Sequence, residues 1–181
     1  DFAPRVPVKE TKADRLQQIA AAAVEIEKPD EDDITTWKIR MKDPSPKVDV
    51  LMEILGDGGY LTGPGPGVAV AAVHKDLIRL VSDRLAAAEV RHGIITGDQS
   101  TAERDLALAR FQDGHDRVLL FTVAAGSVGL DMTAADLLVN IQRPWSMVKA
   151  VQTEGRVHRI GSEIHQSVRI IDVVTEGTIE E

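Results

Sequence analysis

Two arginines near the carboxyl end of the sequence are the strongest candidates for chemistry. Arg156 and Arg159 lie three residues apart in the string QTEGRVHRIG. On a helix this spacing puts both side chains on one face, so both guanidinium groups can point at one polyanion. Arginine suits phosphate because its charge is permanent and its planar donors match phosphate oxygens in pairs. A solvated helix with scattered charge is the ordinary alternative for a bare pair of arginines.

A second candidate lies in TVAAGSVGLDMTAADLLVNIQRPW, where Gly126 and Gly129 follow an apolar segment. Glycines after a strand let the backbone approach a ligand closely, and free peptide N–H groups there can bind phosphate. A turn that simply needs glycine to join a strand to a helix is the competing interpretation. For each glycine taken singly, both interpretations stay open.

Two further candidates stand at expected strand ends. In IITGDQSTAERDL, Ser100 and Glu103 form a capping box, and the helix that begins there could hold a phosphate near Thr96 and Gly97. Helix capping alone explains these residues equally well. Lys75 follows the apolar run VAVAAVH and is either a phosphate contact or a solvated lysine.

Composition excludes several other kinds of site. The chain has no cysteine, which rules out disulfides and thiolate metal sites, and its five histidines form no HxxxH pair. The formal net charge of -8 argues against indiscriminate binding to polyanions, so cations that meet DNA must be local. We see neither a signal peptide nor an apolar run of about 18 residues. We therefore expect no membrane partner and a cytoplasmic, nucleoid or nuclear location rather than secretion.

The elements that must position these residues alternate along the chain. Residues 1–46 read as a lead-in with a helix over 11–24 and an acidic run over 25–33, to which we assign no function. In residues 47–181 the patterns predict the following elements: helices over 47–56, 75–89, 101–112 and 146–158, and strands over 68–73, 90–96, 117–123, 135–141 and 168–174. This order predicts an α/β fold, a mainly parallel sheet with helices on both faces, whose strand ends gather ligands.

Taken together, the motifs resemble those of the Swi/Snf family of superfamily-two helicase-like DNA translocases. RVHRIG has the form of the family's sixth motif, TVAAGSVGLDM resembles the fifth, and the strand before Lys75 resembles the fourth. ADRLQQIAAA and DPSPKVDVLMEIL are similar to the stretch that joins the two motor lobes. The resemblance extends over nearly the whole chain and implies a RecA-like C-terminal motor lobe.

The resemblance implies a role for each candidate. Arg156 and Arg159 would be arginine fingers that reach the γ-phosphate of ATP held on the other lobe, and Gln152 would help to order that site. The remaining candidates fall into two groups: Gly129 and Asp131 on the nucleotide side, and Lys75, Thr96, Gly97, Thr122, Gly126, Ser127 and Trp145 at the DNA. The family commonly has glycine in place of Ser127 and asparagine in place of Asp131, and a carboxylate beside triphosphate is unfavourable without a cation or donor. Trp145 is either a wedge at the minor groove or an aromatic anchor that covers the sheet end.

Half of the ATPase machinery is missing from the sequence. No GxxxxGK[ST] loop and no acidic strand end of the magnesium-binding kind occur. ATP and Mg²⁺ would be held mainly by a first RecA-like lobe of the same polypeptide, while DNA would be contacted through its backbone. We expect the chain to be cut at both ends, because it begins with Asp1 and closes on a capping box at Thr178.

Two other functions fit parts of the sequence. One is a strand-separating helicase or restriction-system motor of the same superfamily, which would need an inserted pin for which we see no room. The other is a non-catalytic α/β module that binds a partner through its acidic surface. Within the family, QTEGRVHRIG leans toward the annealing-helicase branch.

The missing loop leads to a direct prediction. The purified chain should not hydrolyse ATP, with or without DNA, because the residues that cradle phosphate and bind magnesium are not in it. Phosphate release measured with and without duplex DNA checks this. DNA-stimulated hydrolysis by the chain alone would refute the assignment.

Overall fold

Five parallel strands form the central sheet in the computed structural model, which describes residues 12–27, 38–126, 130–157, 165 and 167–180. The strand order is β4-β5-β3-β6-β7. The strands are β3 (Gly67–Ala72), β4 (His92–Ile95), β5 (Val118–Thr122), β6 (Ala135–Asn140) and β7 (Arg169–Asp172). All four neighbouring pairs run parallel, which agrees with the predicted crossovers.

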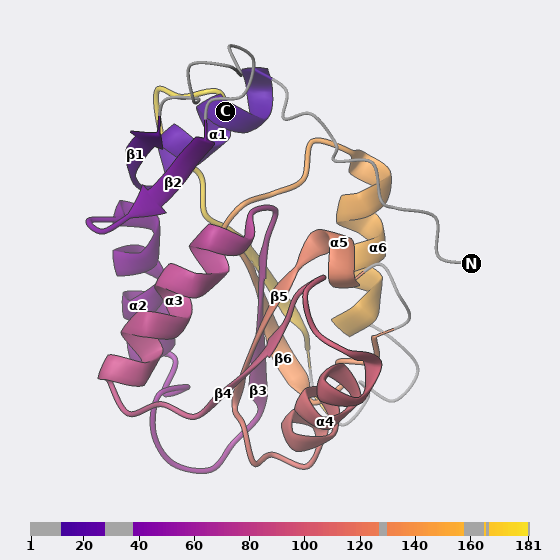
Figure 1. The fold of residues 1–181 in the computed structure, drawn as a ribbon. Coiled ribbons are helices and arrows are strands. Elements are labelled where there is room, and N and C mark those ends of the chain that lie inside the picture. The colour runs from indigo at the N-terminus through magenta and orange to yellow at the C-terminus, as the bar shows by residue number, and fades with distance from the viewer. Residues whose placement is uncertain (1–11, 28–37, 127–129, 158–164, 166, 181) are drawn as a thin grey trace.

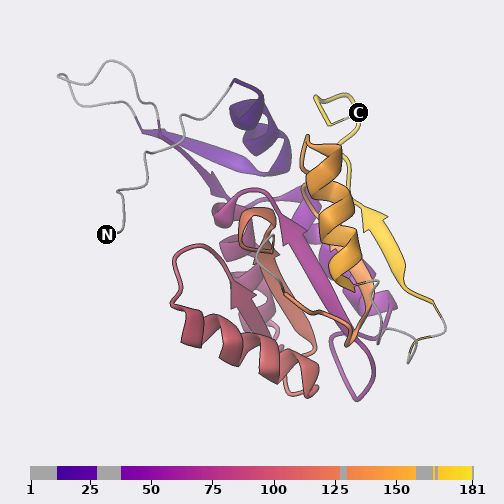
Figure 2. The same cartoon turned by 90° about the vertical axis from the view of Figure 1, so that its right-hand side faces the viewer.

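Alternating strand residues build two cores, one on each face of the sheet. Val68 and Val70 of β3 join a core with the helices α2 (Pro46–Asp57) and α3 (Lys75–Ala87). Ala69 and Ala71 face the opposite core, which receives residues of α4 (Thr101–Gln112), α5 (Val123–Gly126) and α6 (Met147–Val157). Figure 1 shows α2 and α3 on the left of the sheet and the other three helices on the right. Figure 2 turns α4 and α6 toward the viewer.

Local signals place the first turns of two helices as expected. Ser45 caps α2 by accepting a hydrogen bond from the Val48 N–H, and Pro46 opens the helix. At α4 the predicted capping box is confirmed: the Ser100 hydroxyl accepts from the Glu103 N–H, and the Glu103 carboxylate accepts from the Ser100 N–H. The Glu103 carboxylate accepts from the Ser100 hydroxyl and from the Ser100 N–H, and because these bonds favour its charged form the pKa of Glu103 is lowered.

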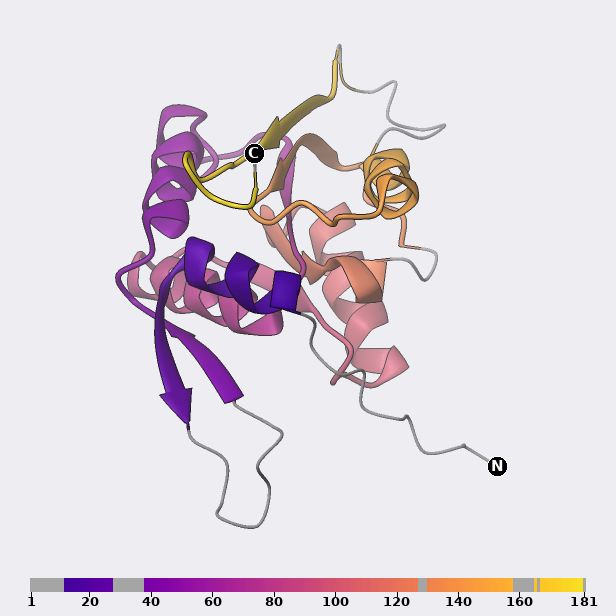
Figure 3. The same ribbon diagram turned by 90° about the horizontal axis from the view of Figure 1, so that it is seen from above.

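The lead-in contains a hairpin that the sequence patterns did not indicate. Its helix α1 (Lys12–Ala21) ends earlier than predicted, because residues 23–27 leave it to form a strand. That strand, β1 (Ala23–Glu27), pairs antiparallel with β2 (Lys38–Lys42). Residues 28–33 of the acidic run lie outside the described residues. Seen from above, α1 lies over one end of the sheet and the hairpin extends away from it (Figure 3).

Lys47 joins three parts of the chain from a buried position at the start of α2. Its ammonium donates to the Ile141 carbonyl at 2.9 Å, the Val173 carbonyl at 2.8 Å and the Glu180 carboxylate at 2.6 Å. The Lys47 side chain is 2% exposed, and burial lowers its pKa while Glu180 opposes that shift. A cation at a helix N-terminus is disfavoured by the helix dipole, so this lysine depends on its acceptors.

The ion pair between Lys47 and Glu180 also holds the last described residues of the chain against α2. Residues 176–180 form turns and a bend, and no helix begins at Thr178 within the described residues. Glu181 lies outside the described residues. Among the described helices, none has the length and apolar character needed to cross a bilayer.

Removal of Lys47 should destabilise the fold strongly. Lys47→Met should lower the free energy of unfolding by about 3 kcal/mol or more, because Glu180 is then left as a buried, unpaired charge. The double variant Lys47→Met, Glu180→Met should recover only part of that loss, because no charge remains buried but the Ile141 and Val173 carbonyls still lack the Lys47 donor. Urea unfolding of the chain measures both.

The matched control is Lys42→Met, which breaks an ion pair with Glu25 whose side chains are 54% and 50% exposed. We expect little change from it, because exposed ion pairs contribute little to stability. Equal losses in Lys42→Met and Lys47→Met would contradict the assignment of Lys47 as a buried link.

Candidate functional site

The carboxyl ends of β3 and β4 bring three of the predicted DNA contacts, Lys75, Thr96 and Gly97, to one edge. Lys75 is the first residue of α3, separated by two residues from the end of β3 at Ala72, and its side chain is exposed. Its ammonium pairs with the Asp98 carboxylate at 2.9 Å. Asp98 lies in the turn after β4, next to Thr96 and Gly97, so this ion pair joins the ends of two strands that have β5 between them.

The turn after β4 is organised by Gln99, a residue that the sequence analysis missed. The Gln99 side-chain oxygen Oε1 accepts from the Thr96 N–H at 2.7 Å, and the side-chain nitrogen Nε2 donates to the Ile94 carbonyl at 2.7 Å. The Thr96 N–H is therefore already occupied. Gly97 is exposed, with nothing within 4 Å of the place where a side chain would begin. Any ligand at this turn would have to use Gly97 and the residues after it.

The turn after β5 is closely packed. Thr122, the last residue of β5, is 6% exposed, so its side chain lies inside the protein rather than at the surface. The short helix α5 follows and ends at Gly126, where an added Cβ would lie 2.8 Å from the Phe121 ring. Gly126 is thus required by packing, whatever it binds. Ser127 and Gly129 lie outside the described residues.

Past the end of β6, Trp145 is half-exposed. Its relative exposure is 52%, so the indole is not the buried anchor that was one of its two interpretations. It lines a cavity of about 280 Å³ together with Gln17 and Met147. The neighbouring Arg143 pairs with Asp172 at 2.6 Å, which ties the segment to β7. The tryptophan therefore projects from a fixed segment.

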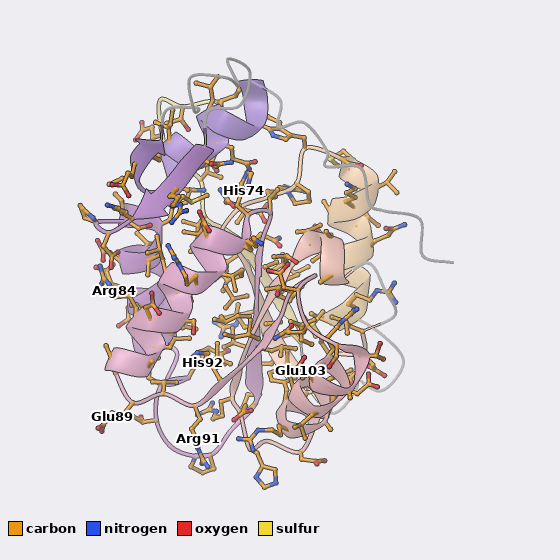
Figure 4. The ribbon with its side chains drawn as sticks, viewed as in Figure 1. His74, Arg84, Glu89, Arg91, His92 and Glu103 are labelled. Carbon is orange, nitrogen blue, oxygen red and sulfur yellow. The ribbon has the colours of Figure 1, made fainter. Side chains whose placement is uncertain are left out.

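Three buried glutamines, Gln17 and Gln18 of α1 and Gln142 after β6, make hydrogen bonds at this edge of the sheet. The Gln142 side chain is fully buried, and its oxygen accepts from the His74 N–H at 3.1 Å. Figure 4 shows His74 near the end of β3, where its Nδ1 lies 3.3 Å from the Gln18 amide. Gln17 donates to the Arg143 carbonyl at 3.0 Å. Glutamines in a lead-in helix carry no motif, and only the structure connects them to the edge.

The residues predicted for the nucleotide side form a separate group along α6. Gln152 and Arg156 are four residues apart on this helix, so their side chains share one face. Gln152 is exposed and Arg156 is half-buried. The Arg156 carbonyl accepts from the Met132 N–H at 3.1 Å, which places Asp131 beside the last turn of the helix. Arg159 lies outside the described residues.

Gln152 and Arg156 could contact an anionic ligand that is bound mainly by another domain. They offer one guanidinium and one amide on an accessible helix face. The Asp131 carboxylate accepts from the Thr133 N–H at 3.3 Å within its own turn, which accounts for an acid at this position without a ligand. Among the residues that the structure describes, no group of three or more His, Asp or Glu side chains could hold a metal ion.

Comparison with known proteins identifies the family and supports the fold. Residues 46–161 match the family described as the helicase conserved C-terminal domain. The chain belongs to this family. Relatives of this helicase C-terminal domain include an uncharacterized ATP-dependent helicase of Schizosaccharomyces pombe, 40% identical over 93 residues, which are 51% of the chain and 9% of the relative.

Further relatives confirm the predicted membership of the Swi/Snf family. SWI/SNF-related matrix-associated actin-dependent regulator of chromatin subfamily A-like protein 1 of Xenopus laevis is 33% identical over 113 residues, 62% of the chain and 12% of the relative. The helicase C-terminal domain thus spans about a tenth of the length of these relatives. The C-terminal part of the Fun30 ATPase domain superposes with a TM-score of 0.66 at 19% identity, covering 76% of this chain and 43% of that one. This similarity confirms the RecA-like α/β fold.

The close packing of Gly126 makes a stability prediction for the helicase C-terminal domain. Gly126→Ala should lower the free energy of unfolding by roughly 1–3 kcal/mol, because the new methyl group overlaps the buried Phe121 ring. Gly97→Ala is the matched control and should change stability little, since that position opens to solvent. Chemical denaturation compares the two. Similar losses in both variants would contradict the packing argument.

Proposed function

We propose that this helicase C-terminal domain is the second motor lobe of an ATP-dependent double-stranded DNA translocase. It would work with a first RecA-like lobe of the same polypeptide. The observation that supports this most is on α6, where Gln152 and Arg156 share one accessible helix face and Arg159 follows three residues later in the sequence. Such a face is suited to a phosphate group that approaches from outside the domain.

The chemistry proposed for the arginines is charge stabilisation during phosphoryl transfer. Negative charge spreads over the oxygens of the γ-phosphoryl group in the transition state, and a positioned guanidinium lowers the energy of that state. Arg156 and Arg159 would supply this charge, and Gln152 would order the site. ATP, with Mg²⁺, would be held mainly by the first lobe. Gly129 and Asp131 would border the nucleotide from this side.

The DNA contacts are assigned to the other group of residues, which lies at and beyond the carboxyl ends of the sheet strands. Backbone N–H groups and a few cations there would meet phosphates without reading bases. The proposed contacts are Lys75, Thr96, Gly97, Thr122, Gly126, Ser127 and Trp145. Of these, Thr122 is buried and the Thr96 N–H is already hydrogen bonded, so they would act by supporting their turns. Trp145, half-exposed on a fixed segment, would wedge at the minor groove.

The arginine roles are tested in the full-length protein. Arg159→Ala should reduce DNA-stimulated ATP hydrolysis by about 10³-fold or more, the usual contribution of an arginine finger. DNA affinity should stay nearly unchanged, because the residue would face nucleotide rather than DNA. Steady-state hydrolysis and fluorescence anisotropy with duplex DNA measure the two effects.

The matched control is Arg79→Ala, which removes one exposed cation from α3 on the other face of the sheet. It should leave hydrolysis unchanged. Collapse of DNA binding in Arg159→Ala with hydrolysis intact would reverse the role assigned to this arginine.

A further inference from the structure

We infer that Arg104 is a positioning residue that fixes the spacing between the two turns proposed to meet the DNA backbone. One turn follows β4 and contains Gly97; the other follows β5 and contains Gly126. This inference rests on the proposed function, because it assigns those turns to DNA. The relevant contact is a single hydrogen bond from the Arg104 guanidinium to the Ala125 carbonyl, at 3.1 Å.

Capping of α4 directs Arg104 toward this contact. Glu103, labelled at α4 in Figure 4, is held back to Ser100 by the capping box and is exposed. Arg104, the next residue, is half-buried and reaches α5. Its own N–H donates to the Ser100 carbonyl at 3.1 Å. Through its N–H, Arg104 is held to Ser100 at the end of the turn after β4, and through its side chain it is bonded to the turn after β5.

The first turn of α4 has little else to hold it. Phe111, near the far end, is the buried residue of this helix, with Ala107 and Leu108 partly buried against the same core. Residues Thr101–Glu103 are exposed. No apolar side chain therefore anchors the start of α4, and the Arg104 hydrogen bond supplies the link to α5.

The accepting carbonyl suits a guanidinium. Ala125 is the penultimate residue of α5, a helix of four residues. Carbonyls at a helix end have no partner within the helix, so a charged donor is well suited to such an acceptor. The hydrogen bond lies one residue before Gly126, which cannot shift freely because Phe121 packs against it.

The contact is not optimised for stability. The Arg104 Nε is buried and finds no hydrogen-bond partner among the described residues. A buried N–H without an acceptor costs free energy, so an aliphatic residue at this position would avoid that cost. Because stability alone does not account for an arginine here, its role is better explained by what it positions. The distance between the turns that contain Gly97 and Gly126 decides whether both can contact phosphates of one DNA strand at the same time.

The test uses the full-length protein and a linear duplex, with DNA-stimulated ATP hydrolysis measured against DNA concentration. Arg104→Gln should raise the half-saturating DNA concentration on the order of tenfold, the usual effect of losing a hydrogen bond from a charged donor. Arg104→Lys, which keeps the charge and one donor, should raise it less. The rate at saturating DNA should stay near that of the wild type, since the nucleotide side is not touched.

Arg79→Gln removes the same charge from an exposed site and should not shift the half-saturating concentration. An unchanged concentration in Arg104→Gln, with stimulation intact in the wild type, overturns the inference alone. Loss of saturating rate and melting temperature together in both Arg104 variants, without a shift in the DNA requirement, also overturns it, because a purely structural role gives that pattern. A wild-type protein without any DNA stimulation overturns the proposed function, and this inference with it.

Discussion

The central strand β3 is the constraint on which the rest of the domain depends. All its residues are buried, and it pairs with β5 on one side and β6 on the other. A strand covered on both faces has no room for polar side chains, and GVAVAA supplies only small apolar ones. Gly67 lets the Phe111 ring of α4 approach to a distance that a Cβ would block. The small residues of β3 thus decide how closely the two helical layers come together.

At the carboxyl ends of β3 and its neighbouring strands, the chain leaves the sheet, and backbone groups there need hydrogen-bond partners from side chains. Lys47 satisfies the carbonyls of Ile141 and Val173 just beyond β6 and β7, and Gln142 satisfies the His74 N–H beyond β3. The Lys47–Ile141 hydrogen bond is buried and the other two are partly buried, so the loss of a partner would be costly at each. The lead-in helix adds Gln17 and Gln18 to the same set. The lead-in is therefore part of the site's support and not merely a connection to it.

Sequence periodicity was sufficient for the elements whose patterns are local. The helix Thr101–Gln112 was predicted with its observed bounds, because a capping box marks its start. The β1–β2 hairpin was missed: its strands are separated by residues 28–37, and no two-residue turn signal joins them. Gln99, Gln142 and Lys47 were also missed, since a single amide or amine carries no pattern. Their importance depends on which carbonyls and N–H groups the fold leaves open nearby, and that is a property of tertiary structure.

The charge at the carboxyl edge bears on how such a domain would hold DNA. Lys75 is paired with Asp98, and Arg143 with Asp172 and Glu154, in a chain whose net charge is -8. The Lys75–Asp98 pair, whose side chains are 66% and 68% exposed, can exchange partners at little cost because water screens it well. A phosphate could therefore displace Asp98 from Lys75, yet the gain would be small for the same reason. Under the proposed function, weak contacts have an advantage. A lobe that steps along DNA must release the backbone in every cycle, and contacts that are each nearly balanced against a local carboxylate allow release without a large barrier.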